Sequence, residues 1–433
     1  MRRRLWAGSV LILAVVVTGL GNTPGSAENW PGWRGPRGDG PSAETNLPTS
    51  WNGATGENIR WKVKIPGEGH SSPVVWGDRL FLTTCLPESL ERVLLCLDRT
   101  TGETLWRQTV VVSKLETKHK LNSHASATPA TDGKLVYVAF LKIDGHTIRA
   151  PNVGNERSVT PGEIVVAAYD FDGKPRWQAT VGEFISAHGF CSNPVLYEDL
   201  VIINGDHDGD GYLVALDRET GKPRWKVKRP HGIRSYATPI VRELAGKTQM
   251  VLSGSQSVVS YAPQTGETHW SMEGPTEQFV ASMVDDGKQV YLTAGYPDHY
   301  ILAIKPDGEG DITDSHVAWR EKRGAAYVPS PIVVGRYLLV VSDGGIASCF
   351  EAATGKRHWM DRIGTRYSAS PVAANGLVYF TADQGVTTIV RPGPRFEEVA
   401  KCELGEDVSS SPAISQGCLF VRGNEHLFCI GMP

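Results

Sequence analysis

The chain has 433 residues, of which 40% are hydrophobic and 21% are charged. This composition is typical of a folded globular protein and excludes a disordered or fibrous one. The formal net charge of −3 leaves no basic excess that could neutralise phosphates, so we expect no nucleic-acid partner.

The N-terminus has the three-part pattern of a signal peptide. Arginines at positions 2–4 precede the apolar run Leu11–Val17, and the small residues 25–27 follow it. We therefore expect residues 1–27 to be removed on export to the periplasm or the cell exterior. The apolar run is too short to span a membrane, and no later segment is long enough to do so. Without residues 1–27 the chain has 41 basic and 47 acidic residues, a formal charge of −6.

Residues 215–225, ALDRETGKPRW, return in modified form at 96–106, 260–270 and 349–359. Each copy belongs to a unit that opens with an alternating apolar run, and most units span 40 to 48 residues. Four short strands in each such unit predict the blades of a propeller. The eight units open at Pro73, Pro129, Pro194, Pro239, Met283, Pro331, Pro371 and Pro412.

The eighth unit stops after three strands, at the C-terminus. Ile59–Val63, which precedes the first opening, can supply the fourth strand and close the ring without a free sheet edge. The sequence therefore predicts an all-β fold, an eight-bladed propeller of four-stranded antiparallel blades over residues 59–433. We expect residues 28–58 to form an extended leader and the protein to be a monomer.

The repeated turn and tryptophan have a structural explanation. Gly221 suits a tight turn with a positive φ, and the small Ala215 leaves room for a large ring. Trp225 would then fill the wedge between neighbouring sheets. Val399 takes this place in unit seven. We predict the same blade-docking role for Trp61, Trp106, Trp177, Trp225, Trp270, Trp319 and Trp359.

The pattern A-x-D-x-x-T-G-x-x-x-W, complete in residues 215–225, resembles the tryptophan-docking repeat of the PQQ-like, or quinoprotein-type, propeller family. The resemblance covers residues 59–433, and NWPGWRGPRGDGPS looks like the leader segment of secreted members. The family implies two alternative functions. BamB-type propellers bind partners and carry no cofactor, whereas quinoprotein dehydrogenases use PQQ with Ca²⁺.

In those dehydrogenases a disulfide between adjacent cysteines stacks on the quinone, and Glu, Asn and Asp side chains hold the Ca²⁺. The seven cysteines here include no adjacent pair, and no C-x-x-C-H motif offers a haem. The chain also lacks the long insertions that build the enzymatic pocket. We therefore expect no cofactor and assign no catalytic residue, with PQQ and Ca²⁺ as the alternative.

In a propeller, the loops that enter the innermost strands share one face with those between the second and third strands. Residues three and five places before each opening should point to the channel, because side chains two apart in an extended strand share a side. Arginine and tyrosine are frequent anchors for partners. The candidate mouth for a ligand or partner is His70, His124, His188, Asp206, His207, Asp208, Arg234, Tyr236, Tyr327, Arg366 and Tyr367.

Two interpretations of the acidic and histidine side chains are open. His70, His124 and His188, with Asp206 and Asp208, could hold the ion of a metal-dependent enzyme on the face of blades one to three. They could instead be hydrogen-bonded mouth residues at different depths. We assign no metal site from the sequence.

The last hairpin, residues 417–431, contains two cysteines. A turn at Gly423–Asn424 would set Cys418 directly opposite Cys429, and an oxidising compartment could then cross-link them. Burial as small apolar residues is the alternative.

These observations together favour an exported, non-catalytic propeller. We expect it to bind an envelope protein or polymer through the face of blades one to three, as BamB-type propellers bind partners.

Overall fold

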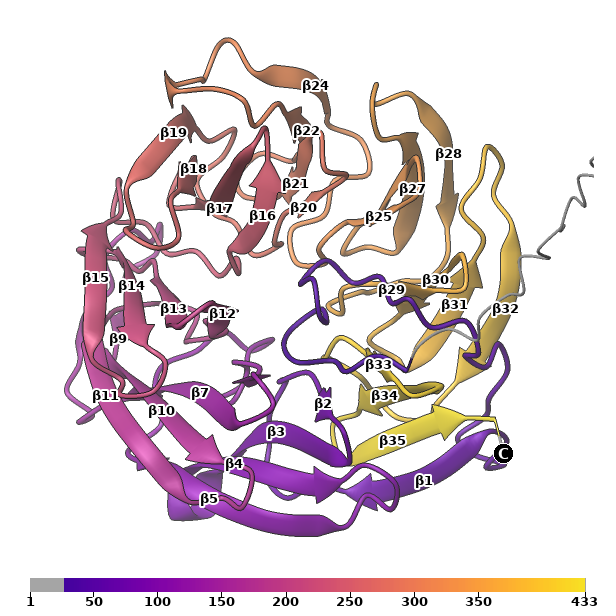
Figure 1. Cartoon of the computed structure of the whole chain (residues 1–433), viewed down its shortest axis with the longest axis horizontal. Helices are drawn as coiled ribbons and strands as arrows, with labels where there is room; N and C mark the ends of the chain where they lie inside the picture. The colour runs from indigo at the N-terminus through magenta and orange to yellow at the C-terminus, as the bar shows by residue number, and fades with distance from the viewer. Residues whose placement is uncertain (1–26, 433) are drawn as a thin grey trace, which may run out of the picture.

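The structure is a computed structural model that describes residues 27–432, so the predicted signal peptide lies, except for Ala27, outside the described residues. Eight antiparallel sheets stand around a central axis (Figure 1). The predicted all-β fold with eight four-stranded blades is thereby confirmed. Among the described residues, the chain forms no helix with the length and apolarity that a bilayer crossing takes.

Blades one to four follow one another in the sequence, each starting at its innermost strand. Blade one contains β2 (Val74–Trp76), β3 (Arg79–Leu86), β4 (Glu91–Asp98) and β5 (Thr104–Val112), and blade two contains β6 (Ala130–Thr131), β7 (Leu135–Lys142), β10 (Gly162–Asp170) and β11 (Pro175–Phe184). Blade three contains β12 (Val195–Tyr197), β13 (Leu200–Gly205), β14 (Tyr212–Asp217) and β15 (Pro223–Lys228), and blade four contains β16 (Ile240–Leu244), β17 (Lys247–Gly254), β18 (Ser257–Tyr261) and β19 (Thr268–Glu273). The 3₁₀ turn η1 (Pro87–Ser89) joins β3 to β4, and the short pair β8 (Ile148–Arg149) and β9 (Ser158–Val159) lies between β7 and β10.

Blades five to eight continue the same order. Blade five contains β20 (Val284–Asp285), β21 (Val290–Ala294), β22 (Tyr300–Ile304) and β24 (Val317–Glu321), and blade six contains β25 (Ile332–Val334), β26 (Tyr337–Val341), β27 (Ile346–Glu351) and β28 (Arg357–Arg362). Blade seven contains β29 (Val372–Ala374), β30 (Leu377–Thr381), β31 (Val386–Val390) and β32 (Glu398–Glu403), and blade eight contains β33 (Ala413–Ser415), β34 (Cys418–Arg422), β35 (His426–Gly431) and β1 (Ile59–Lys64).

The two ends of the described chain meet in blade eight. Strand β1 pairs antiparallel with β35, with Trp61 opposite Cys429, and Figure 1 shows the indigo and yellow strands side by side. The ring is therefore closed by the N-terminal strand, as predicted, and β1 covers the outer edge of β35.

The docking tryptophans lie against the turn of the next blade. The indole N–H of Trp177 donates to the carbonyl of Arg218 at 2.9 Å, and Gly221 in the same turn has a φ of 70°. A β-carbon on Gly221 would lie 2.5 Å from the Trp177 ring, so both the conformation and the space require glycine. The equivalent N–H to carbonyl bonds join Trp61 to Arg99, Trp106 to Phe171, Trp225 to Pro263, Trp319 to Ala352 and Trp359 to Gly393.

Trp270 departs from this arrangement because blade five reaches back over blade four. Strand β23 (Gly310–Asp311) adds to blade four as a fifth, parallel strand beside Trp270. Trp270 is fully buried, and its indole N–H donates to Oε1 of Gln249 in its own blade. In blade seven, Val399 stands in the tryptophan position and is 37% exposed.

Residues 28–58, the leader, run across one end of the ring (Figure 1). Trp30 forms a β-bridge with Val75 of blade one. The Arg34 guanidinium donates to the carbonyl of Pro331 at the start of blade six, 2.7 Å away. Because these partners belong to innermost strands on different sides of the ring, the leader spans the axis.

The turn of the last hairpin falls at residues 424–425, one place later than predicted. Gly423 pairs with His426 through a 2.7 Å backbone hydrogen bond. The Glu406 carboxylate accepts the backbone N–H groups of Glu425 and His426, and this fixes the turn. The register that follows is therefore shifted relative to the prediction.

Because of this shift, Cys418 pairs with Gly431 and does not lie directly opposite Cys429, so that detail of the prediction is wrong. Both thiols are buried and free in the structure. A hydrogen bond from the neighbouring Cys429 lowers the pKa of Cys418 to about 7. Their cross-link stays a prediction.

A central cavity as the candidate binding site

Small polar residues form a closed hydrogen-bonded ring around the axis, one from each blade. The members precede the unit openings and are Ser72, Thr128, Asn193, Thr238, Ser282, Ser330, Ser370 and Ser411. In most links a backbone N–H donates to the side-chain oxygen of the next blade, as Ser72 does to Thr128 at 2.9 Å. Between blades three and four, the Asn193 side-chain amide donates to Thr238 instead. The ring holds the innermost strands at a fixed spacing around a polar axis.

A cavity of about 400 Å³ adjoins this ring. All eight residues three places before the openings line it, as predicted: His70, Ser126, Cys191, Tyr236, Val280, Val328, Ser368 and Ser409. Trp33 of the leader is also in the wall. The wall therefore combines residues of the blade-entry loops with a residue of the leader.

The residues five places before the openings do not line the cavity. The prediction for this row assumed an extended backbone. His124, however, lies in a turn, and the segment around Arg234 is irregular. Side chains alternate from one side to the other over the last three residues before each opening. This alternation does not extend to the residue five places before the opening.

One side of the cavity wall is aromatic. The rings of His119 and His188 are 5.5 Å apart and edge-on, and His188 lies 6.2 Å from Tyr236. Burial lowers the pKa of His188 to about 4, helped by the charge of Arg234. Burial, with the charge of Arg422 second, lowers the pKa of His70 to about 4 as well. Both imidazoles are therefore neutral at pH 7, and they offer hydrogen bonds and ring faces without charge.

The two aspartates predicted for the mouth are held in buried ion pairs. Asp206 accepts from Arg229 at 2.8 Å, and both side chains are fully buried. Asp208 accepts from Arg234 at 2.8 Å, and burial raises its pKa against the effect of that arginine. Neither pair lines the cavity. Their contacts join the loop after β13 to the loop before β16.

The long connection of blade two, residues 143–161, folds over blade three. Ala150 packs with Ala187 in a small apolar cluster. The Asn152 amide donates to the carbonyl of Gly232 at 2.8 Å, and Arg234 donates back to the carbonyl of Asn152. This connection therefore belongs to the rim around the cavity and is not a free arm.

The other candidate residues serve the fold. His207 is buried, with its ring 5.7 Å from that of Phe184, and Tyr367 is buried in the core of blades six and seven. Arg366 pairs with Asp383 at 2.6 Å on the exposed rim. The predicted mouth residues that do line the cavity are His70, His188, Tyr236 and Tyr327.

Sequence reasoning missed several wall residues. His119 and Asn122 lie in the extra length between the first two openings, and that long interval was a usable signal. Trp33 comes from the leader, whose course the repeat does not determine. Asp343 follows β26 and accepts the backbone N–H of Tyr327 at 2.7 Å, a loop-to-loop contact that no local pattern indicates.

A ring of eight blades, six of them joined to the next blade by an indole N–H to carbonyl bond, around a central cavity defines a propeller of the PQQ-like class. The chain belongs to the PQQ-like propeller family whose model is described as outer membrane protein assembly factor BamB, and it matches that model over residues 43–163, 151–309 and 298–391.

Known proteins agree with this assignment. The chain is 24% identical to the outer membrane protein assembly factor BamB of Burkholderia pseudomallei (strain K96243) over 389 residues, which are 86% of this chain and 84% of that one. The crystal structure of BamB from Moraxella catarrhalis superposes with a TM-score of 0.60 at 11% identity, covering 86% of this chain and 97% of the other. The quinohemoprotein alcohol dehydrogenase of Comamonas testosteroni gives 0.60 at 11% identity, over 94% and 81%. At such identities the two structures share the fold with this chain.

Proposed function

We propose that this chain is an exported, non-catalytic scaffold that binds a protein of the cell envelope at its central cavity and the surrounding rim. Two observations on the sequence support the proposal: the predicted signal peptide and the membership of a family named for outer membrane protein assembly. Relatives in that family carry the same description.

The observation that carries the proposal is the largely uncharged, polar wall of the cavity. The nearby carboxylates of Asp206 and Asp208 are already neutralised by buried arginines. His70 and His188 are uncharged at pH 7, because burial lowers the pKa of each to about 4. A wall of hydroxyl, imidazole and phenol groups suits side chains or backbone of a bound segment, and the one carboxylate among its described residues, that of Asp343, is already bonded to two backbone N–H groups.

The rim adds exposed apolar side chains. Leu121, which also lines the cavity, is 52% exposed, and Tyr296 is 53% exposed. The Tyr296 ring lies 6.5 Å from that of Tyr327 in the wall. Exposed aromatic and aliphatic residues around a polar hollow are typical of a protein-binding surface, where they anchor a partner while the hollow accepts its polar groups.

The residues of the cavity do not fit PQQ with Ca²⁺, the alternative ligand. PQQ carries three carboxylates, but no lysine or arginine is present among the described residues that line the cavity. The one carboxylate in the wall, that of Asp343, already accepts the backbone N–H groups of Tyr327 and Val328. We therefore expect no quinone absorbance and no dye reduction after incubation with PQQ and Ca²⁺, and saturable binding with turnover would overturn the non-catalytic proposal.

Introduction of a negative charge at the rim tests the binding role. The purified protein would be used to capture partners from envelope extracts, alongside the variants Leu121→Asp and Tyr296→Asp. Matched controls are Leu105→Asp and Val399→Asp, which place the same charge at exposed sites (44% and 37%) on the outer strands of blades one and seven.

The proposal predicts one captured envelope protein that both rim variants lose and both controls retain. Equal capture by all four variants would contradict it. Retention of a polysaccharide or other polymer in place of a protein would reject the protein partner and keep the cavity as the binding site.

A further inference from the structure

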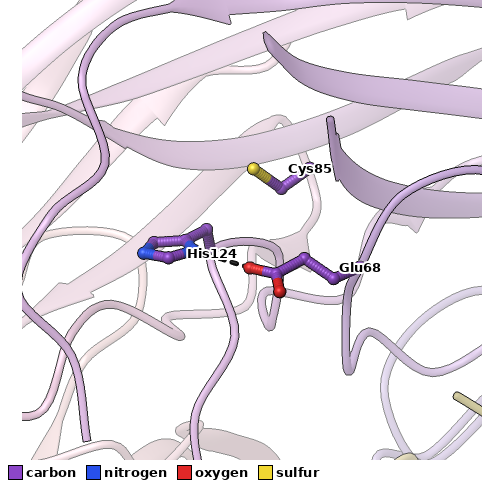
Figure 2. A group of neighbouring side chains, drawn as sticks. All are labelled: Glu68, Cys85 and His124. Atoms are coloured by element: carbon purple, nitrogen blue, oxygen red, sulfur yellow. Dashed lines mark hydrogen bonds and ion pairs between the residues drawn. The ribbon is translucent and has the colours of Figure 1, made fainter. Parts of the chain in front are cut away.

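A cluster of three potential metal ligands lies outside the cavity, where blades one and two meet. The side chains of Glu68, Cys85 and His124 lie next to one another (Figure 2), and their ligand atoms are all within 4.8 Å of one another. Among residues 27–432, no other three His, Cys, Asp or Glu side chains come together in this way. We infer that Glu68, Cys85 and His124 form a Zn²⁺ site with a fourth position open to solvent.

This inference goes beyond the proposed partner binding and does not depend on it. It also differs from the metal site considered in the sequence. Of that set only His124 belongs to the cluster, since Asp206 and Asp208 are paired with arginines.

The backbone places two of the ligands on the same side. Glu68 and Cys85 form an antiparallel bridge in which each N–H donates to the carbonyl of the other at 2.8 Å. Residues paired directly across strands project their side chains to the same side. The close approach requires Gly67, because a β-carbon there would lie 2.0 Å from the carbonyl oxygen of Cys85. Glu68 and Cys85 are thus brought together by the fold and not by chance side-chain rotations.

The third ligand is oriented by a hydrogen bond. Nε2 of His124 lies 3.1 Å from the carbonyl oxygen of Glu116, which can only accept, so Nε2 carries a proton. The other ring nitrogen, Nδ1, is the atom left to bind a metal, and it lies 2.7 Å from Oε1 of Glu68. Two acceptors at that distance need a proton or a cation between them. Metal-bound histidines commonly donate their other N–H to a backbone carbonyl in this way.

The ligand set is that of zinc. One thiolate, one imidazole and one carboxylate suit a borderline-soft ion and disfavour Mg²⁺ and Ca²⁺, which prefer oxygen alone. With Zn–N and Zn–S distances of about 2.1 and 2.3 Å, tetrahedral ligands lie about 3.5 Å apart. Pairs that include Sγ of Cys85, at most 4.8 Å apart, need to contract by no more than about 1.3 Å, whereas Nδ1 of His124 and Oε1 of Glu68, now 2.7 Å apart, need to separate by about 0.8 Å. Both changes are within the reach of side-chain rotation. The Glu68 side chain is 45% exposed, so solvent reaches the remaining position.

The charges around the cluster allow a cation to bind. Burial raises the pKa of the Cys85 thiol to about 11, the largest effect on that group. Zn²⁺ must therefore displace the thiol proton. Of the two positive charges that act on Cys85, Arg92 is paired with Glu116 at 2.6 Å, and Lys118 is the other. Binding displaces the thiol proton of Cys85 and the proton held between Nδ1 of His124 and Oε1 of Glu68, so the affinity should rise with pH.

Titration of the purified, metal-free protein with Zn²⁺ and with Co²⁺ tests the site. We expect one equivalent to bind and the Co²⁺ form to show a thiolate-to-cobalt charge-transfer band that Zn²⁺ abolishes. Cys85→Ser and His124→Ala should remove this band and weaken Zn²⁺ binding at least about tenfold. Cys96→Ser and His146→Ala are the matched controls, since neither residue belongs to the cluster or to the cavity wall, and both should behave as wild type in metal binding.

A stability measurement keeps the test decisive if a variant folds poorly. Zn²⁺ should raise the Tm of the wild type and of both controls but not that of Cys85→Ser. Absence of the thiolate band from the wild-type protein would overturn the proposal, and so would its persistence in Cys85→Ser. Loss of partner capture without any change in metal binding would affect only the proposed function.

Discussion

The indole ring of Trp51 stacks on the ring of Tyr379, with centroids 6.5 Å apart and planes 15° from parallel. Tyr379 stands eight residues after its unit opening, as do Phe81 and Tyr137, which contact the docking tryptophans of their own blades. Blade seven has no such tryptophan. The leader therefore supplies to blade seven the ring that its own sequence lacks, and so ties the N-terminal segment to the propeller.

Replacing Trp51 by alanine should lower the free energy of unfolding by about 3–5 kcal/mol, because a buried aromatic side chain is lost from the core. Trp51→Phe should cost much less, since the buried indole N–H has no partner among the described residues. Trp61→Phe is the matched comparison and should cost more, because it also loses the bond to Arg99. Urea unfolding measures all three. A change of less than about 1 kcal/mol in Trp51→Ala would contradict the docking role.

Gly221→Ala should destabilise the protein more than Gly246→Ala. Both glycines have positive φ, 70° and 75°, so both substitutions carry a conformational cost of about 1–2 kcal/mol. A β-carbon on Gly246 meets nothing within 4 Å, whereas one on Gly221 collides with the Trp177 ring. The collision should add about 1–3 kcal/mol. Equal losses in thermal or urea unfolding would show that the turn, and not the packed indole, determines this glycine.

Asp208→Ala should be severely destabilising, by about 3–5 kcal/mol, because it leaves the buried Arg234 guanidinium without a counter-charge. The double variant Asp208→Leu with Arg234→Met should recover most of that loss. Asp210→Asn removes an exposed pair with Lys228 and should have no measurable effect. If the double variant is no more stable than Asp208→Ala in urea unfolding, the uncompensated charge is not the cause.

The stability should fall as the pH is lowered from about 6.5 to about 4. In the folded state the pKa values of His70 and His188 are lowered to about 4, whereas the unfolded chain protonates them near 6.5. Below 6.5 the unfolded state binds more protons, and each histidine adds a slope of about 1.4 kcal/mol per pH unit. The groups that oppose protonation include Arg422 and Lys118 beside His70, where Glu68 acts in the other direction.

Arg234, His119 and Arg157 oppose the protonation of His188. The variant His70→Gln with His188→Gln should flatten the dependence of the unfolding free energy on pH between 4 and 6.5. His146→Gln, at an exposed site, is the control and should leave the slope unchanged. An unaltered slope in the double variant would contradict the assigned burial of these two histidines.

The fold was predictable from the sequence because the residues that determine the shape of a blade recur at the same positions in most units. A small residue opposite tryptophan and a turn glycine recur in register, and the structure pairs Ala215 with Trp225 accordingly. The two-residue alternation of side chains also held for the last three residues of each blade-entry loop, and it correctly predicted which residues line the cavity three places before the openings. These residues approach the innermost strand in extended conformation, so the sequence could predict that their side chains point to the channel.

The remaining site residues could not be predicted because their positions depend on contacts between distant loops. The sequence placed Asp206 and Asp208 at the mouth of the channel. In the structure they form buried ion pairs with arginines that lie more than 20 residues later in the chain. Glu68 and His124 each stand five places before an opening, in the row predicted to point to the channel. Only the bridge between Glu68 and Cys85 shows that a strand cysteine lies beside them.

Site-directed photo-crosslinking in the envelope tests the central claim most directly. A photoreactive residue would replace Leu121 or Tyr296 at the rim, and Leu105 or Val399 on the outer strands. Partner binding at the cavity predicts that the two rim positions cross-link to the same envelope protein and that the two outer positions do not. Cross-links from the outer strands alone, or none from the rim, would contradict binding through this face.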